Sequence, residues 1–87
     1  MYKLSEAEQN VVKKLIVESS SVLDKIEQID DDTFLKKDAY LDSLSFINVA
    51  IGIEEKLKIS LKSDESLFTQ DVKYVDLIKK LNILRQM

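Results

Sequence analysis

Apolar residues recur with a helical period in three long segments of the chain. The first segment opens with Ser5-Glu6-Ala7-Glu8, a capping box in which Ser5 caps a helix and Glu8 reaches back to it. The apolar positions that follow are spaced to line one helical face: Val11, Val12, Leu15, Ile16, Val22, Leu23 and Ile26. Serines favour local side-chain hydrogen bonds, so we predict that the helix ends or weakens at the three serines of residues 19–21.

The second segment predicts a helix from about Ser43 to Leu57 that is apolar on two sides. One side carries Leu44, Ile47 and Ile51. The other carries Phe46, Ala50, Ile53 and Leu57. Two interpretations follow: a central helix of the core, or a helix with one face used for docking. Polarity returns at Glu54-Glu55-Lys56.

The third segment predicts a terminal helix from near Asp71, with its apolar residues three, four and seven positions apart: Tyr74, Leu77, Ile78 and Leu81. A short connecting helix is expected over residues 64–69. The pattern therefore predicts an all-α fold, a four-helix bundle of three main helices and one short one. We expect its core to contain Leu15, Ile47, Ile51, Leu77, Ile78 and Leu81.

Composition narrows the functions open to the chain. Its 87 residues fit a single domain, 1–87. Cysteine and histidine are absent, which removes thiolate chemistry, Cys-based zinc sites and the commonest general base. Gly52 is the only glycine, so a Gly-rich phosphate loop is excluded. We therefore expect no enzyme activity.

Charge and hydropathy bear on partners and location. The net charge is −3, and no basic stripe with interleaved aromatic residues is present, so a nucleic-acid partner is not expected. No apolar run approaches the roughly 20 residues that span a bilayer, and the charged start lacks a signal-peptide core. The expectation is a monomeric cytoplasmic protein without a membrane span.

Residues 30–42 predict a long acidic loop, and loops of this length in small domains are commonly functional. Four residues are expected to anchor it: Phe34, Leu35, Tyr40 and Leu41. Asp30 and Asp32 alternate as in a calcium-binding loop. However, leucine occupies the positions of the sharp-turn glycine and the bidentate glutamate in such a loop, so we predict a solvated loop and no metal site.

Ser43 stands between this loop and the strongly apolar helix. A serine at such a position is commonly a helix cap. A second interpretation is chemical, because a phosphate ester at a helix N-terminus is stabilised by free N–H groups and by the positive end of the helix dipole.

Leu41-Asp42-Ser43-Leu44 resembles the Asp-Ser-Leu attachment motif of acyl carrier proteins and of related peptidyl and aminoacyl carriers. The resemblance extends over residues 4–84, through the preceding loop, the second helix and the terminal helix. It implies an acyl-carrier-like bundle that carries 4′-phosphopantetheine covalently on Ser43. It also implies a phosphopantetheinyl transferase that uses coenzyme A and magnesium, with Asp42 near the metal, and acyl or aminoacyl loading and transfer enzymes as further partners.

The resemblance also implies a surface beside Ser43 that docks partners or shelters an acyl chain: Leu44, Phe46, Ile47, Ile51, Glu54 and Glu55. Two features depart from the family. Its usual glycine shortly before the serine is missing from Asp38-Ala39-Tyr40, which predicts strain at Ala39. Ser45 and Asn48 replace acids of typical fatty-acid carriers, which favours a specialised biosynthetic pathway.

The cargo stays open among fatty acyl, polyketide, aminoacyl and D-alanyl groups. An alternative function is an unmodified helical module that binds a partner helix through the apolar second helix. A hydrolase with Ser43 as nucleophile is disfavoured, because without histidine the base would have to be lysine or a carboxylate.

Overall fold

The computed structural model describes residues 4–61 and 71–85. In these ranges the α-helices are α1 (Glu6–Ser19), α2 (Ser43–Leu57) and α4 (Tyr74–Arg85), with a short 3₁₀ helix, η1 (Ile26–Gln28), after α1. The same ranges contain an isolated bridge between Phe34 and Lys73 but no strand. The all-α prediction is therefore confirmed, whereas the predicted short helix over 64–69 lies outside the described residues.

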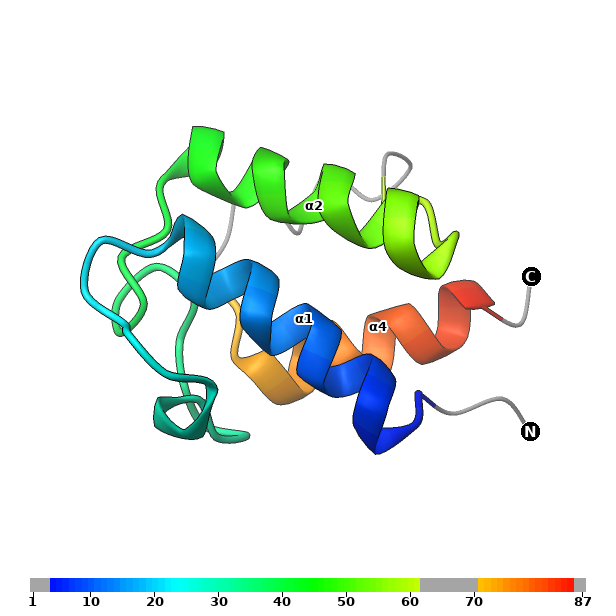
Figure 1. Ribbon diagram of the computed structural model, residues 1–87, viewed down its shortest axis with the longest axis horizontal. Coiled ribbons are helices and arrows are strands. Elements are labelled where there is room, and N and C mark those ends of the chain that lie inside the picture. Colours follow the sequence, from blue (N-terminus) through cyan, green and yellow to red (C-terminus); the bar gives the residue numbers. More distant parts are fainter. Residues whose placement is uncertain (1–3, 62–70, 86–87) are drawn as a thin grey trace.

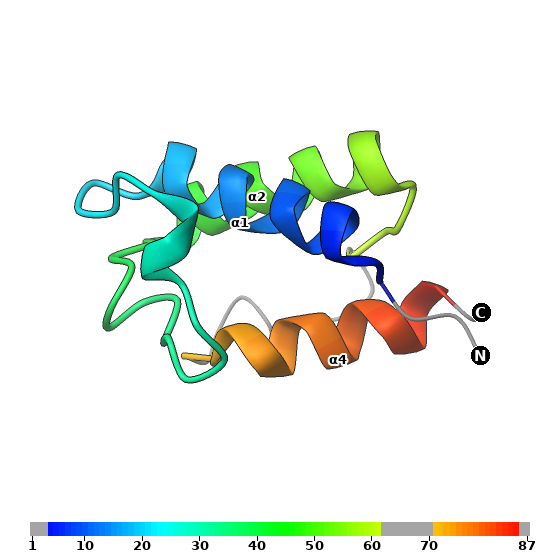
Figure 2. The ribbon, with the colours of Figure 1, turned by 60° about the horizontal axis from the view of Figure 1, so that its bottom comes forward.

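The three helices form two levels. Helices α1 and α2 lie side by side (Figure 1), and α4 runs beneath this pair when the molecule is turned (Figure 2). Each helix contributes apolar side chains to one shared core, with Val12 and Ile16 from α1, Phe46, Val49 and Ile53 from α2, and Tyr74, Leu77, Ile78 and Leu81 from α4. The predicted inner face of the last helix is thus confirmed, although that helix begins three residues after Asp71.

Helix α1 begins as the sequence predicts. The Ser5 hydroxyl accepts a hydrogen bond from the Glu8 N–H at 3.2 Å, and the Ser5 N–H donates to the Glu8 carboxylate at 3.0 Å. The helix ends at Ser19, and the Ser20 hydroxyl then accepts bonds from two later N–H groups and donates to the Ala39 carbonyl at 2.6 Å. The expectation that Val22 continues the helical face is wrong, because these serine bonds turn the chain and leave Val22 exposed.

The core prediction is wrong for Ile47 and Ile51. Both lie on the outer side of α2 and are 43% and 46% exposed, because Phe46, Val49 and Ile53 turn the other side of the helix inward. Leu15, also predicted in the core, is half-buried and packs against it.

Gly52 sets the close approach of α1 and α2. A Cβ atom placed on Gly52 would lie 2.6 Å from Cδ2 of Leu15, well inside van der Waals contact. The only glycine of the chain therefore occupies the point where the leucine of one helix crosses the backbone of the other.

The acidic loop before α2 is fastened to the start of α4. The first N–H groups of a helix have no partner within it. Here the Tyr74 N–H donates to the Thr33 carbonyl at 2.8 Å, and the Val75 N–H donates to the Asp31 carbonyl at 3.2 Å. In the other direction, the Lys36 N–H donates to the Asp71 carboxylate at 2.8 Å. Loop and helix thus satisfy each other's backbone groups.

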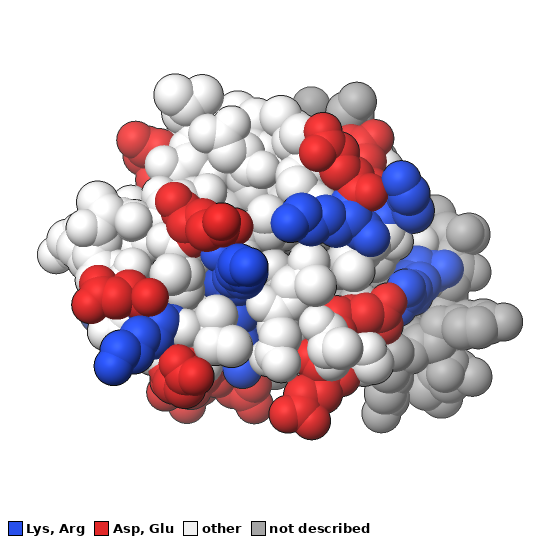
Figure 3. Space-filling model, viewed as in Figure 1, with Lys and Arg blue, Asp and Glu red and all other residues white. Residues whose placement is uncertain are grey.

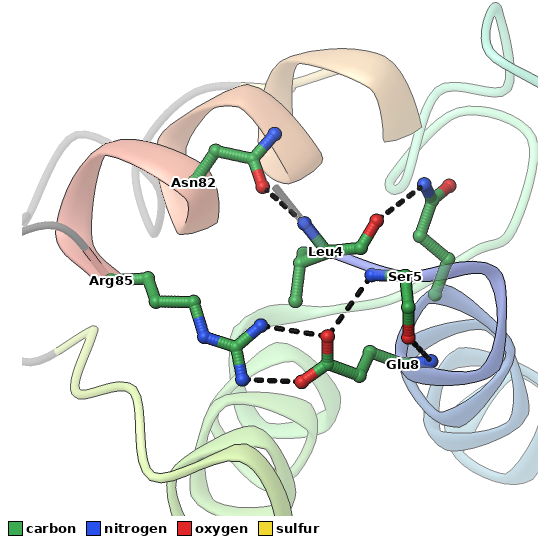
Figure 4. Close-up of polar contacts among 6 residues, drawn as sticks. Leu4, Ser5, Glu8, Asn82 and Arg85 are labelled. Carbon is green, nitrogen blue, oxygen red and sulfur yellow. Dashed lines mark hydrogen bonds and ion pairs between the residues drawn. The ribbon is translucent and has the colours of Figure 1, made fainter. Parts of the chain in front are cut away.

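The start of α1 and the end of α4 are clamped together (Figure 4). The Arg85 guanidinium donates to both carboxylate oxygens of Glu8, one bond measuring 2.7 Å. Beside it, the Leu4 N–H donates to the Asn82 side chain at 2.8 Å. The Arg85 hydrogen bond is the main reason that the pKa of Glu8 falls to about 2. Glu8 therefore both caps α1 and ties it to α4.

Candidate functional site

Ser43 is the first residue of α2, and its side chain is exposed. The preceding residue, Asp42, is the cap: its carboxylate accepts a hydrogen bond from the Ser45 N–H at 2.8 Å. The interpretation of Ser43 as the cap is therefore wrong, because the carboxylate of Asp42 takes that position. Within the described parts of the chain, no hydrogen bond of the Ser43 hydroxyl is found.

Two features beside Ser43 bear on its chemistry: the positive end of the α2 dipole, which favours a phosphate ester, and the Asp42 carboxylate, which favours a cation. The positive end of the α2 dipole lies at Ser43 and stabilises added negative charge there. Next to it, the N–H of Ser45 lowers the pKa of the Asp42 carboxyl, which keeps this exposed side chain ionised. A serine hydroxyl and a carboxylate that can hold a divalent cation are thus adjacent on the surface.

The outer side of α2 presents an exposed apolar strip beside Ser43. We call it the outer face of α2 and define it by Leu44, Ile47 and Ile51, of which Leu44 is 68% exposed. The surface over the start of α2 is largely uncharged in Figure 3. Glu54 and Glu55 follow toward the end of the helix, half-buried and exposed respectively.

Phe46, placed with these residues on sequence grounds, lies elsewhere. Its side chain is buried among core residues on the opposite side of α2. Phe46 therefore takes no part in the exposed surface that a partner would touch, because at about 100° per residue it lies about 200° around the helix from Leu44 and about 100° from Ile47.

The exposed position of Tyr40, near Ser43, was not predicted from the sequence. It was expected to anchor the loop, but it is 61% exposed and takes a left-handed backbone conformation with φ 55°. The left-handed backbone expected at Ala39 is found one residue later, at Tyr40, and Ala39 itself is buried. The signal available in the sequence was the apolar residue on each side of Tyr40, since two inward neighbours force the residue between them outward.

The Asp30–Asp32 cluster is used for local turns. The Asp30 carboxylate accepts hydrogen bonds from the Asp32 N–H at 2.9 Å and from the Thr33 hydroxyl at 3.2 Å. In residues 4–61 and 71–85, no group of three acidic side chains is arranged to hold a metal ion. The cluster thus shapes the loop that leads to Ser43.

None of the helices among the described residues is long and apolar enough to cross a membrane. Comparison with protein families, curated proteins and solved structures found no match to this chain. The functional argument therefore depends on the residues of the site.

Proposed function

We propose that this protein is a carrier that bears 4′-phosphopantetheine on Ser43 and presents a thioester cargo to partner enzymes. The observation that carries the proposal is the exposed, unbonded hydroxyl of Ser43 at the start of a helix capped by Asp42. The resemblance of Leu41-Asp42-Ser43-Leu44 to the attachment motif of acyl carrier proteins supports the same residue. The carrier itself catalyses nothing, since the flexible arm acts by raising the local concentration of its cargo.

The modification is a phosphoryl transfer from coenzyme A. The Ser43 oxygen forms a bond to the phosphorus that carries the pantetheine arm, and the P–O bond joining that phosphorus to the nucleotide in the pyrophosphate of coenzyme A breaks. The hydroxyl proton passes to a base of the transferase, and the nucleotide leaves as adenosine 3′,5′-bisphosphate. In phosphoryl transfer, metal ions neutralise charge on the phosphates and the protein positions the reacting groups. Asp42 is the carboxylate of this chain that we assign to the magnesium ion of the transferase complex.

The outer face of α2 and the two glutamates supply the surface for partners or cargo in this proposal. An apolar strip beside the attachment residue suits enzymes that must approach Ser43, and Glu55 adds exposed negative charge. The proposal further includes a short helix over 64–69, completing a four-helix acyl-carrier-like bundle, and a monomeric protein in the cytoplasm. Assigned NMR chemical shifts of the full chain will test the fourth helix.

Intact-mass analysis tests the attachment. The protein is incubated with coenzyme A, magnesium and a broad-range phosphopantetheinyl transferase. We expect the wild type to gain the mass of one arm, the Ser43→Ala variant to gain none, and the control Ser45→Ala variant, two residues along the same helix, to gain one. An unmodified wild type, or an arm on another serine, would refute the proposal.

A specialised pathway follows from two neutral residues on α2. Ser45 and Asn48 stand where typical fatty-acid carriers have acids, and Asn48 is exposed. Charge steers docking between carriers and basic enzyme patches. A fatty-acid malonyl transferase should therefore load the modified wild type poorly and the Ser45→Asp/Asn48→Glu variant better, most clearly at low salt. Equal and efficient loading of both would indicate an ordinary fatty-acid carrier.

The alternative function is an unmodified helical interaction module. It is favoured by the exposed outer face of α2, which would bind a partner helix in its apolar strip. The intact-mass experiment separates the two functions, because an interaction module takes up no arm. A known carrier in the same mixture is the control that shows the transferase to be active.

A further inference from the structure

The backbone around Tyr40 is fixed by its neighbours. Ala39 and Leu41 are both buried, and their N–H groups donate to the Phe34 and Leu35 carbonyls at 3.1 and 3.0 Å. With both neighbours held inward, residue 40 must reverse the chain direction and point outward. It does so with φ 55°, the left-handed conformation that favours glycine.

Among the residues that the structure describes, no contact accounts for a tyrosine at this position. A residue with a Cβ is disfavoured in the left-handed region, and a bulky ring more so than asparagine. Tyr40 is 61% exposed, so burial does little to offset that strain. Among the described residues, the Tyr40 hydroxyl makes no hydrogen bond. Glycine or asparagine would fit the backbone better, so the exposed ring is a candidate for a contact outside the described fold.

The position of Tyr40 indicates where it acts. Tyr40 lies three positions before Ser43, and three residue steps along the chain span at most about 11 Å. An enzyme that takes the Ser43 hydroxyl into its active site has to cover the surface around it. Tyr40 and Leu44, both mostly exposed, lie on either side of Ser43 in the chain. An exposed aromatic ring there falls inside the area that such an enzyme covers.

We propose that the Tyr40 ring is a recognition contact for the enzyme that modifies Ser43, an inference that rests on the proposed function. The contacted surface is apolar or aromatic, because the exposed part of the ring is mostly hydrocarbon. Tyrosine is among the residues that most often dominate binding energy at protein interfaces, where a well-packed ring is costly to remove. Tyr40 thus contributes to recognition of the carrier rather than to the chemistry.

The test uses variants that separate the ring from the backbone strain. Tyr40→Gly and Tyr40→Asn remove the ring and tolerate the left-handed backbone, whereas Tyr40→Phe retains the ring. Modification rates are measured against carrier concentration with coenzyme A, magnesium and the broad-range transferase. For the Gly and Asn variants we expect KM to rise about five- to tenfold, as for an interface residue of this class, with kcat little changed. Ile83→Ala, at an exposed apolar residue of α4, is the control and should keep the wild-type KM.

Thermal melts complete the test. The Gly and Asn variants should melt at or above the wild-type Tm, because they relieve strain, and Tyr40→Phe should keep both the wild-type Tm and KM. The inference is overturned if the Gly and Asn variants keep KM within about twofold of wild type. It is also overturned if Tyr40→Phe raises KM as much as Tyr40→Gly does, or if both the Gly and the Asn variant have a Tm below that of the wild type. A wild type that takes up no arm would instead refute the proposed function, and this inference with it.

Discussion

Two isoleucines of α2 offer a direct test of which side of the helix belongs to the core. Ile53 is fully buried, whereas Ile47, six residues earlier in the same helix, is 43% exposed. Replacing each by alanine removes the same atoms from the same kind of backbone. Helix propensity and changes in the unfolded chain are therefore nearly equal in the two variants, and the difference in stability reports burial.

The expected magnitudes differ several-fold. At about 0.8 kcal/mol per buried methylene, the carbons lost in Ile53→Ala are worth roughly 2.4 kcal/mol. The cavity left in the core brings the loss of unfolding free energy to about 3–4 kcal/mol, inside the usual range for such truncations. Ile47→Ala opens no closed cavity, and alanine is the better helix former, so its cost should be about 0.5 kcal/mol or less.

Urea unfolding followed by far-ultraviolet circular dichroism measures both values. Equal m values for wild type and variants would show that the unfolding transition itself is unchanged. The reasoning predicts that Ile53→Ala is at least about 2 kcal/mol less stable than Ile47→Ala. Costs within about half a kcal/mol of each other, or a larger cost at Ile47, would show that the outer face of α2 has been wrongly assigned.

Three further predictions concern single contacts. The folded-state pKa of Glu8, about 2 against an ordinary 4.5, means that its bond to Arg85 stabilises the fold above about pH 4.5 and is lost as the pH falls toward 2. Glu8→Gln should therefore lower Tm at neutral pH and flatten the decline of Tm in acid; an unchanged decline would contradict this. In the Leu15→Ala variant, Gly52→Ala should add about 1 kcal/mol of stability through helix propensity. In the wild type the new methyl group meets Leu15, so the same substitution should stabilise less or destabilise. If urea unfolding shows the same effect of Gly52→Ala in both backgrounds, that contact is excluded. Asp42→Ala should lower Tm, whereas Asp42→Asn, which keeps a capping oxygen, should lower it less; equal losses would argue against the cap.

Local sequence signals predicted the helices well. The capping box at Ser5 and Glu8, the start of the second helix at Ser43 and the inner face of the last helix around Leu77 and Ile78 are all found in the structure. These features depend on neighbouring residues and on the helical period. The short 3₁₀ helix after α1 was not predicted, because three residues carry no periodic signal.

The features that were missed depend on contacts between distant segments. The second helix is apolar on two sides, so its pattern allowed Ile47 either in the core or on the surface. Packing of the other side of α2 into the core leaves Ile47 on the surface. The pairing of Glu8 with Arg85 joins residues 77 positions apart, beyond any local pattern. At Tyr40 the burial of both neighbours overrides the preference of tyrosine for the more common backbone conformations.

The bonds between the acidic loop and the start of α4 have a consequence for the order of events during protein synthesis. Residues 31–36 leave the ribosome well before residues 71–75, with which they share backbone hydrogen bonds. Contacts between segments this far apart form only after the intervening chain has closed into a loop, which is slow compared with helix formation. A nascent chain that already exposes Ser43 consequently lacks the settled loop in front of it. If Ser43 is modified as proposed, an enzyme that recognises the folded loop would act only after the last helix has been synthesised.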